Sequence, residues 1–234
     1  YFYPSAGGYS GAKLGYYQDL IDQALFSGPS GINVGVLNML NIKYLSVQGA
    51  VGLPGFERAY SGDDGVVMEN LNVLPKAWFT DSLITMDSQT GVLQRITEEF
   101  NPAQEAFTAS DREISVEPDS LSEVRITTYN ANQITLEISR NNPGFLVLGE
   151  IWYPQGWEIT LNGEETEMIR TNYILRGFEI PAGDHVLEMK MKPVWYSAGR
   201  LMSQLGTILL FGTGAMGLFL LFRKPGEEAD TGNE

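Results

Sequence analysis

Three aromatic side chains and one carboxylate lie close together in the C-terminal half of the chain: Glu150, Trp152, Tyr153 and Trp157. Flat aromatic faces beside a carboxylate are what pyranose rings stack on and hydrogen-bond to. The sequence therefore makes these four residues candidates for a carbohydrate site. A core role for Trp152 is the competing interpretation, because residues 145–152, taken as a strand, place largely apolar side chains on both faces.

A carboxylate on a buried strand face needs a cationic partner, and Arg170 and Arg176 are the candidates for a structural pair with Glu150. No spacing singles out two carboxylates that would cleave a glycosidic bond. We therefore assign no catalytic residue from the sequence.

Other kinds of site are limited by composition. The chain has no Cys, which excludes disulfides, a thiolate nucleophile and Cys-ligated zinc. Its one histidine, His185, excludes a multi-histidine metal site and stands between a turn and a strand, where a structural role is expected. The pair Asp63 and Asp64 offers too few oxygen ligands for calcium, so a solvated turn is the expectation. We predict no metal and no cofactor.

The candidate residues belong to a region that is predicted to be almost entirely β. Turn residues separate short alternating runs, and Asn162-Gly163 is the strongest hairpin signal among them, because a type I′ turn needs two residues at positive φ. The region is predicted to be an antiparallel β-sandwich over residues 113–194. The strands are expected at residues 114–116, 124–129, 133–139, 145–152, 158–161, 168–169, 173–179 and 186–191.

Residues 1–112 are predicted to form a mixed α/β part. Helical spacing of apolar residues indicates a helix from about residue 11 to 26, which ends at Ser27-Gly28-Pro29 because proline cannot continue it. The remaining elements are a short helix at 34–40, a strand at 42–47, a hairpin formed by 56–60 and 66–70, and a helix at about 92–100. The predicted fold class is α+β, with the sandwich followed by one transmembrane helix.

That helix is predicted from residues 201–222, which contain no charged side chain between Arg200 and Arg223. At 1.5 Å per residue, the run is long enough to cross a hydrocarbon core of about 30 Å. Trp195, Tyr196 and Arg200 are expected to anchor it at the interface, so that residues 195–224 make up the membrane segment with its flanks.

One stripe of this helix carries small residues at a spacing of three and four. Small side chains and hydroxyls let membrane helices approach closely, so we predict that the stripe packs against other transmembrane helices. The alternative is that Gly, Ser and Thr are common in any membrane span. The stripe consists of Ser203, Gly206, Thr207, Leu210, Thr213, Gly214 and Gly217.

Charge sets the expected partners and orientation. A formal net charge of −14 argues against nucleic-acid binding and describes a solvated surface. The Arg223-Lys224 pair places the tail in the cytoplasm, which makes residues 1–200 extracytoplasmic and residues 225–234 a disordered cytoplasmic tail. The chain begins at Tyr1 without a signal sequence, so we expect it to be a fragment whose missing part holds further membrane helices.

An ordered set of segments resembles the C-terminal part of bacterial YfhO-like membrane proteins. The set includes Arg170 to Tyr173, Arg176-Gly177 and the run from residue 145 to Trp157, although Gln155-Gly156-Trp157 stands where the family often has the shorter Pro-Gly-Trp. The other segments are Gly8-Tyr9, Lys13, residues 17–20, 38–44, 69–70 and 74–79, Asn162-Gly163, residues 181–183, His185 and Lys192-Pro193.

The resemblance implies a multi-pass protein of the bacterial cytoplasmic membrane, similar to GT-C glycosyltransferases that take a sugar from a polyprenyl-phosphate carrier. In that class the catalytic carboxylates lie on early extracytoplasmic loops, which this chain does not contain. The implied partners are the lipid bilayer, other transmembrane helices of the same protein, and a polyprenyl-phosphate sugar or an envelope glycan. The chain by itself is then expected to be non-catalytic.

Three hypotheses follow from the sequence. The leading one is an accessory extracytoplasmic module of a membrane glycosyltransferase that acts on cell-envelope polymers or lipids. The second is a carbohydrate-binding domain anchored by one helix, and the third is a structural component of the envelope. Many apolar spans encoded upstream of Tyr1 would favour the first hypothesis, and a single signal sequence would favour the second.

Overall fold

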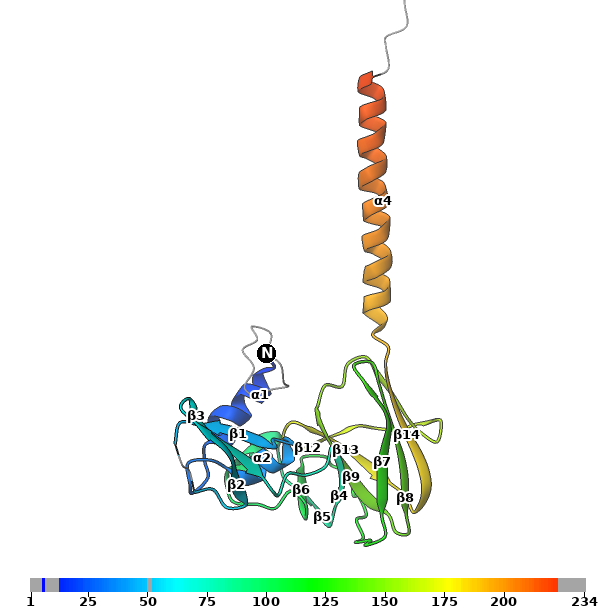
Figure 1. The fold of residues 1–234 in the computed structure, drawn as a ribbon. Coiled ribbons are helices and arrows are strands. Elements are labelled where there is room, and N and C mark those ends of the chain that lie inside the picture. Colours follow the sequence, from blue (N-terminus) through cyan, green and yellow to red (C-terminus); the bar gives the residue numbers. More distant parts are fainter. Residues whose placement is uncertain (1–5, 7–12, 50–51, 223–234) are drawn as a thin grey trace, which may run out of the picture. The chain divides into compact units, whose positions relative to one another are not determined.

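The computed structural model describes residue 6, residues 13–49 and residues 52–222. Two compact units make up the chain, Tyr1–Met191 and Lys192–Glu234. The first unit contains three β-sheets and short helices, and the second contains the long helix α4 (Figure 1). The predicted fold class, α+β with a sandwich and a long apolar helix, is confirmed.

The first unit contains a helix in each of the three predicted regions, although the first begins at Gly15 and the third spans Gln89–Thr97, three residues earlier than the predicted 92–100. Residues 11 and 12 lie outside the described residues. The first helix is α1, and it continues directly into the π-helical turn η1. Two others begin at a side chain that caps a backbone amide: Asn33 accepts from Val36 N at 3.2 Å, and Ser88 accepts from Gly91 N at 3.1 Å. The bounds are α1 Gly15–Leu20, η1 Ile21–Leu25, α2 Val34–Met39 and α3 Gln89–Thr97.

A three-stranded antiparallel sheet in strand order β1-β3-β2 follows α2. Its strands are β1 Tyr44–Val47, β2 Phe56–Gly62 and β3 Gly65–Asn70, and the Asp63-Asp64 turn joins the last two. The predicted strand and hairpin are therefore confirmed.

Two larger sheets form the sandwich. One has six strands in the order β4-β9-β13-β12-β6-β5, and the other has five in the order β11-β10-β14-β8-β7. All neighbours are antiparallel except β5 and β6, which are parallel and joined through α3. The six-stranded sheet contains β4 Ala77–Thr80, β5 Ser82–Thr85, β6 Glu105–Thr108, β9 Gly144–Ile151, β12 Ile169–Thr171 and β13 Leu175–Ile180. The five-stranded sheet contains β7 Glu123–Asn130, β8 Gln133–Arg140, β10 Trp157–Leu161, β11 Glu164–Glu165 and β14 Gly183–Met191.

Strand β9 contributes to both hydrophobic cores. Leu146 and Leu148 pack in the core that lies between the two sheets of the sandwich, and both are fully buried. Phe145 and Val147 belong to the core that contains residues of η1, α2 and α3. The six-stranded sheet is therefore covered on both faces, which is why alternation along β9 gives apolar side chains on each side.

Several predicted strands differ from the structure. Residues 114–116 form no strand; Ile114 and Val116 pack instead against the core that contains residues of η1, α2 and α3. The strand expected at 173–179 begins at Leu175, because Asn172 and Tyr173 adopt positive φ angles of 45° and 69° in a turn.

Four strands were not predicted from the sequence: β4, β5, β6 and β11. Strands β4, β5 and β6 have four residues each, too few for a clear alternation, and β11 has two. Strands from both sides of residue 112 pair in the six-stranded sheet. The division into parts at 112 remains a prediction.

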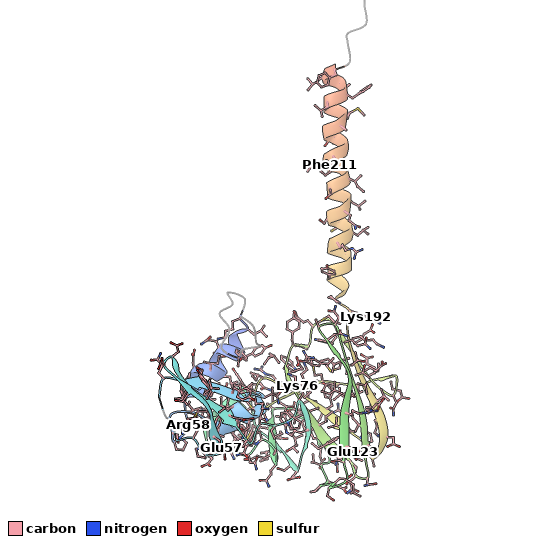
Figure 2. All side chains as sticks on the ribbon, in the orientation of Figure 1. Glu57, Arg58, Lys76, Glu123, Lys192 and Phe211 are labelled. Atoms are coloured by element: carbon pink, nitrogen blue, oxygen red, sulfur yellow. The ribbon has the colours of Figure 1, made fainter. Side chains whose placement is uncertain are left out.

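The second unit contains α4, Val194–Phe222. Its segment Ala198–Phe222 has a mean hydropathy of 2.0 and is long and apolar enough to cross a membrane. None of that segment is buried within the structure, and side chains such as Phe211 project from the helix into open space (Figure 2). The predicted long apolar helix is confirmed.

Candidate functional site

Glu150, near the end of β9, is held by two side chains, Tyr129 of β7 and Lys76 just before β4. Its Oε1 lies 2.8 Å from the Lys76 Nζ and accepts a hydrogen bond of 2.6 Å from the Tyr129 hydroxyl. The Lys76 ammonium also donates to the Gly149 carbonyl at 2.6 Å. Arg170 and Arg176 were the candidates for an ion pair with Glu150; among the described residues the pair is formed by Lys76 instead, and Arg176 is attracted by Glu150 without an ion pair. Lys76 takes the place because it immediately precedes β4 (Figure 2), whose Ala77 pairs with Leu148 of β9.

The Tyr129 hydroxyl is perturbed by this contact. Burial and the hydrogen bond to the Glu150 carboxylate raise the pKa of Tyr129 to about 12, because both disfavour the phenolate. The Lys76 ammonium lies 5.7 Å from the centre of the Tyr129 ring. Glu150 is therefore committed to internal contacts with an ammonium and a hydroxyl.

Trp152 follows the end of β9 and packs against Tyr16 of α1. The two rings meet edge to face with centroids 6.3 Å apart, and the Tyr16 hydroxyl donates to the Trp152 carbonyl. The Arg170 guanidinium lies over three rings, at 4.8 Å from Tyr16, 5.2 Å from Trp152 and 4.6 Å from Tyr173. Such stacking stabilises a desolvated cation. Trp152 is half-buried.

Arg176 occupies the equivalent position beside Trp157. Its guanidinium lies 4.7 Å from the Trp157 ring, and its Nε donates to the Ile151 carbonyl at 3.0 Å. Arg176 is only 5% exposed. Arg170 and Arg176 stand directly opposite each other in the β12–β13 pair.

Burial lowers the pKa of both Arg170 and Arg176, because a low-dielectric surrounding disfavours the charged guanidinium. In the part of the chain that the structure describes, neither guanidinium forms an ion pair with a carboxylate. The nearby Asp19 accepts a hydrogen bond from the Tyr173 hydroxyl at 3.0 Å. The two arginines lie in a cluster of aromatic rings.

The structure thus brings Glu150, Trp152 and Trp157 to one end of the sandwich, linked through Arg176 and Arg170. Tyr153 is exposed, and its hydroxyl donates to the Gln155 side chain at 3.1 Å. Each of the two indoles has a guanidinium stacked on its ring, and carbohydrate binding by these residues remains a prediction.

The sequence did not indicate that Tyr16, Lys76 or Tyr129 belong to this cluster. It indicated Arg170 and Arg176 only as candidate partners of Glu150. Tyr16 and Lys76 reach the cluster from parts of the chain far away in sequence, so no local spacing could have indicated them. For the two arginines a local signal did exist, since they flank the turn at Asn172 and Tyr173.

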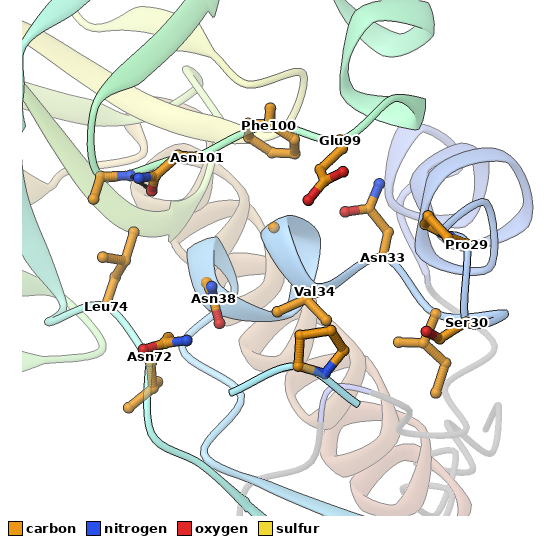
Figure 3. A pocket seen from close by; sticks show the side chains of 16 residues that line it. Pro29, Ser30, Asn33, Val34, Asn38, Asn72, Leu74, Glu99, Phe100 and Asn101 are labelled. Atoms are coloured by element: carbon orange, nitrogen blue, oxygen red, sulfur yellow. Dashed lines mark hydrogen bonds between the residues drawn. The ribbon is translucent and has the colours of Figure 1, made fainter. Parts of the chain in front are cut away.

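A separate cavity of about 590 Å³ lies between α2, the loop before it and the segment after α3. Asparagines line it, and Figure 3 shows Asn33, Asn38, Asn72 and Asn101 around the space with Phe100. Three of these amides are used internally. Asn33 donates to the Ile96 carbonyl at 2.9 Å, Asn38 accepts from Asn70 at 2.7 Å, and Asn101 donates to Gln104 at 3.0 Å. They hold α2 and its neighbouring loops in place.

On α4, the hydroxyls of the small-residue stripe bond to their own helix. Thr207 donates to the Ser203 carbonyl at 2.8 Å, and Thr213 donates to the Leu209 carbonyl at 2.9 Å. The glycines of the stripe have no side-chain neighbour, since a Cβ at Gly206, Gly214 or Gly217 would meet nothing within 4 Å. Packing against other helices remains a prediction.

Comparison with known proteins gives limited similarity. The chain is 25% identical over 81 residues to the uncharacterized protein YfhO of Bacillus subtilis (strain 168). The matched stretch covers 35% of this chain and 9% of that protein, so the chain spans a small part of the relative's length. No protein-family model matches the chain, and no solved structure does. The similarity is confined to part of a YfhO protein, and the long apolar helix supports a membrane protein.

Proposed function

We propose that this chain is the extracytoplasmic module and last transmembrane helix of a larger multi-pass protein of the bacterial cytoplasmic membrane. The observation that carries the proposal is the apolar surface of α4. Leu210, Phe211 and Leu221 are 69%, 72% and 80% exposed, and water disfavours so large an apolar surface whereas hydrocarbon accommodates it. The similarity to YfhO supports the same conclusion.

The orientation can be tested with introduced cysteines, because this chain has none of its own and any cysteine elsewhere in the complete protein can be replaced by serine first. In intact bacterial cells that express the complete reading frame, Glu164→Cys on the exposed β11 should react with a membrane-impermeant maleimide. Thr231→Cys in the tail should react only after permeabilisation. The opposite pattern of labelling would overturn the proposed orientation.

We further propose that the whole protein transfers a sugar from a polyprenyl-phosphate carrier to an envelope polymer or lipid. In this proposal the present chain is non-catalytic and positions or shields the acceptor. The contacts of Glu150 fit a non-catalytic role, because its Oε1 is engaged by Lys76 and Tyr129 within the fold.

Deleting the gene should remove one glycan modification from the envelope, and the complete gene should restore it. Substituting the acidic residues of the upstream loops should abolish transfer from a lipid-linked sugar in membranes, whereas Glu150→Gln should leave the rate of transfer within a few-fold of wild type. Unchanged envelope glycans after deletion would count against the enzyme proposal and favour a structural component of the envelope.

A second candidate function is a carbohydrate-binding domain anchored to the membrane. The half-exposed indole of Trp152 and the exposed ring of Tyr153 favour it. The gene upstream of Tyr1 separates the two candidates, because many apolar spans support the multi-pass protein and a single signal sequence supports the anchored binding domain.

A further inference from the structure

Four hydrogen-bond donors are buried at the end of the sandwich without a partner among the described residues. They are the indole Nε1 atoms of Trp152 and Trp157, the Arg170 Nη2 and the Arg176 Nη1. Each of these atoms can only donate a hydrogen bond. Buried polar groups in native proteins are nearly always hydrogen-bonded, so four unpartnered donors in one cluster need an acceptor that the described residues do not supply.

The charges point to the same requirement. Arg170 and Arg176 are cross-strand neighbours on β12 and β13, and like charges in such positions repel each other. Arg176 is only 5% exposed, and a buried charge is costly unless it is paired and hydrogen-bonded. The Glu150 carboxylate attracts Arg176 but forms its own ion pair with Lys76. Although the chain carries 29 acidic residues, no described carboxylate forms an ion pair with either arginine.

Aromatic stacking accounts for only part of the environment of the two guanidinium groups. The rings of Tyr16, Trp152 and Tyr173 lie against Arg170, and the ring of Trp157 lies against Arg176. A ring stabilises the flat face of a guanidinium, whereas the N–H bonds lie in the plane of the group and point past the ring. The Nε of Arg170 donates to the Tyr173 carbonyl and the Nε of Arg176 to the Ile151 carbonyl, so the buried in-plane donors that stay without a partner among the described residues are the Arg170 Nη2 and the Arg176 Nη1.

We propose that Arg170 and Arg176, together with the indole N–H groups of Trp152 and Trp157, bind the oxyanion group of an acidic ligand. A guanidinium presents parallel N–H donors that match the oxygens of a phosphate or a carboxylate, and an anion between the two arginines removes their repulsion. Glu150 attracts Arg176 but forms no ion pair with it, because its Oε1 lies 2.8 Å from the Lys76 Nζ. The site does not depend on the proposed glycosyl transfer.

The full-length chain in detergent micelles tests the site through its indole N–H signals in NMR spectra. Inorganic phosphate and glucuronate are titrated separately, with sodium chloride at equal ionic strength and neutral glucose as controls. We expect the Trp152 and Trp157 signals to move saturably with at least one of the two oxyanions. The Trp78 signal should stay in place, because its Nε1 already donates to the Pro102 carbonyl at 2.7 Å.

A response to phosphate alone would define the ligand group as a phosphate, and a response to glucuronate alone would define it as a carboxylate. The absence of a saturable shift with either compound would overturn the proposal. An equal shift with chloride or with glucose would also overturn it, because the bound feature would then not be an oxyanion.

Variants then assign the binding to the named groups. Arg170→Gln and Arg176→Gln should each weaken binding of the effective anion at least tenfold, and Trp152→Phe should weaken it several-fold because it keeps a ring but loses the N–H. The control is Arg125→Gln, which removes an exposed arginine that pairs with Glu137 and should leave binding unchanged. Wild-type affinity in both arginine variants would refute the assignment. If a Gln variant does not fold, Arg176→Lys keeps the charge and should still bind at least several-fold more weakly.

Discussion

The ion pair between Lys76 and Glu150 should stabilise the sandwich measurably, and its size follows from its surroundings. The charged atoms are 2.8 Å apart, and the side chains are 35% and 22% exposed. With an effective dielectric constant of about 20, the gross attraction is roughly 6 kcal/mol. Loss of hydration and of side-chain freedom offsets most of this attraction. We therefore expect a net coupling of about 1–2 kcal/mol, above the ~0.2–1 kcal/mol of exposed pairs.

A double-mutant cycle measures this coupling. Lys76→Met, Glu150→Gln and the double variant are prepared in the full-length chain, and urea unfolding in mild detergent is followed by tryptophan fluorescence. Each single variant removes one partner of the ion pair and leaves the other in place. The sum of the two single losses in the free energy of unfolding should therefore exceed the loss in the double variant by the coupling energy.

The matched control is the exposed pair formed by Arg125 and Glu137, whose side chains are 75% and 49% exposed. Its cycle should give about 0.5 kcal/mol or less. The reasoning from burial is refuted if Lys76 and Glu150 couple no more strongly than this control.

Three further predictions concern the same unit. Since the Tyr129 pKa is raised to about 12 in the folded chain, its contribution to stability is complete below the ordinary value of 10.0 and is lost as the pH rises from there toward 12. Wild type should therefore lose unfolding free energy more steeply over this range than Tyr129→Phe, and equal slopes would contradict the assignment. Phe178→Ala, at a fully buried core position, should cost about 3–5 kcal/mol in urea unfolding, whereas Leu121→Ala, at a side chain 73% exposed, should change stability by less than about 0.5 kcal/mol. Gly177→Ala would place a Cβ 2.2 Å from the buried ring of Phe145 and should lower stability by about 1–3 kcal/mol. The control is Gly15→Ala, because a Cβ there would meet nothing within 4 Å. Similar melting temperatures for these two variants would refute the packing argument.

The sequence predicted best where structure is determined by neighbouring residues. Asn162 and Gly163 adopt φ angles of 55° and 85°, as the predicted type I′ turn requires, and the strands on either side of them, β10 and β11, pair directly with each other. The capped helix α2 and the hairpin of β2 and β3 follow from equally local signals.

Structure that depends on distant partners was not predicted. Strand β4 has four residues and exists because Ala77 to Thr80 pair with β9, which lies far along the chain. The same pairing sets Lys76 beside Glu150, so the wrong cationic partner and the missing strand have one cause. Residues 114–116 show the converse error: the pattern predicted a strand, but Ile114 and Val116 pack on a core from a segment without strand partners.

The two arginines of the proposed oxyanion site lie between these cases, because a local feature brings them together. They are three residues on either side of Tyr173, so a hairpin turn centred there must place Arg170 opposite Arg176. A hairpin that sets like charges opposite each other works against its own stability. Sequences that fold well agree across local and global levels, and departures from that agreement concentrate at functional sites. The conflict between strand pairing and charge at Arg170 and Arg176 is therefore itself a reason, independent of the unpartnered donors, to test this end of the sandwich with anions first.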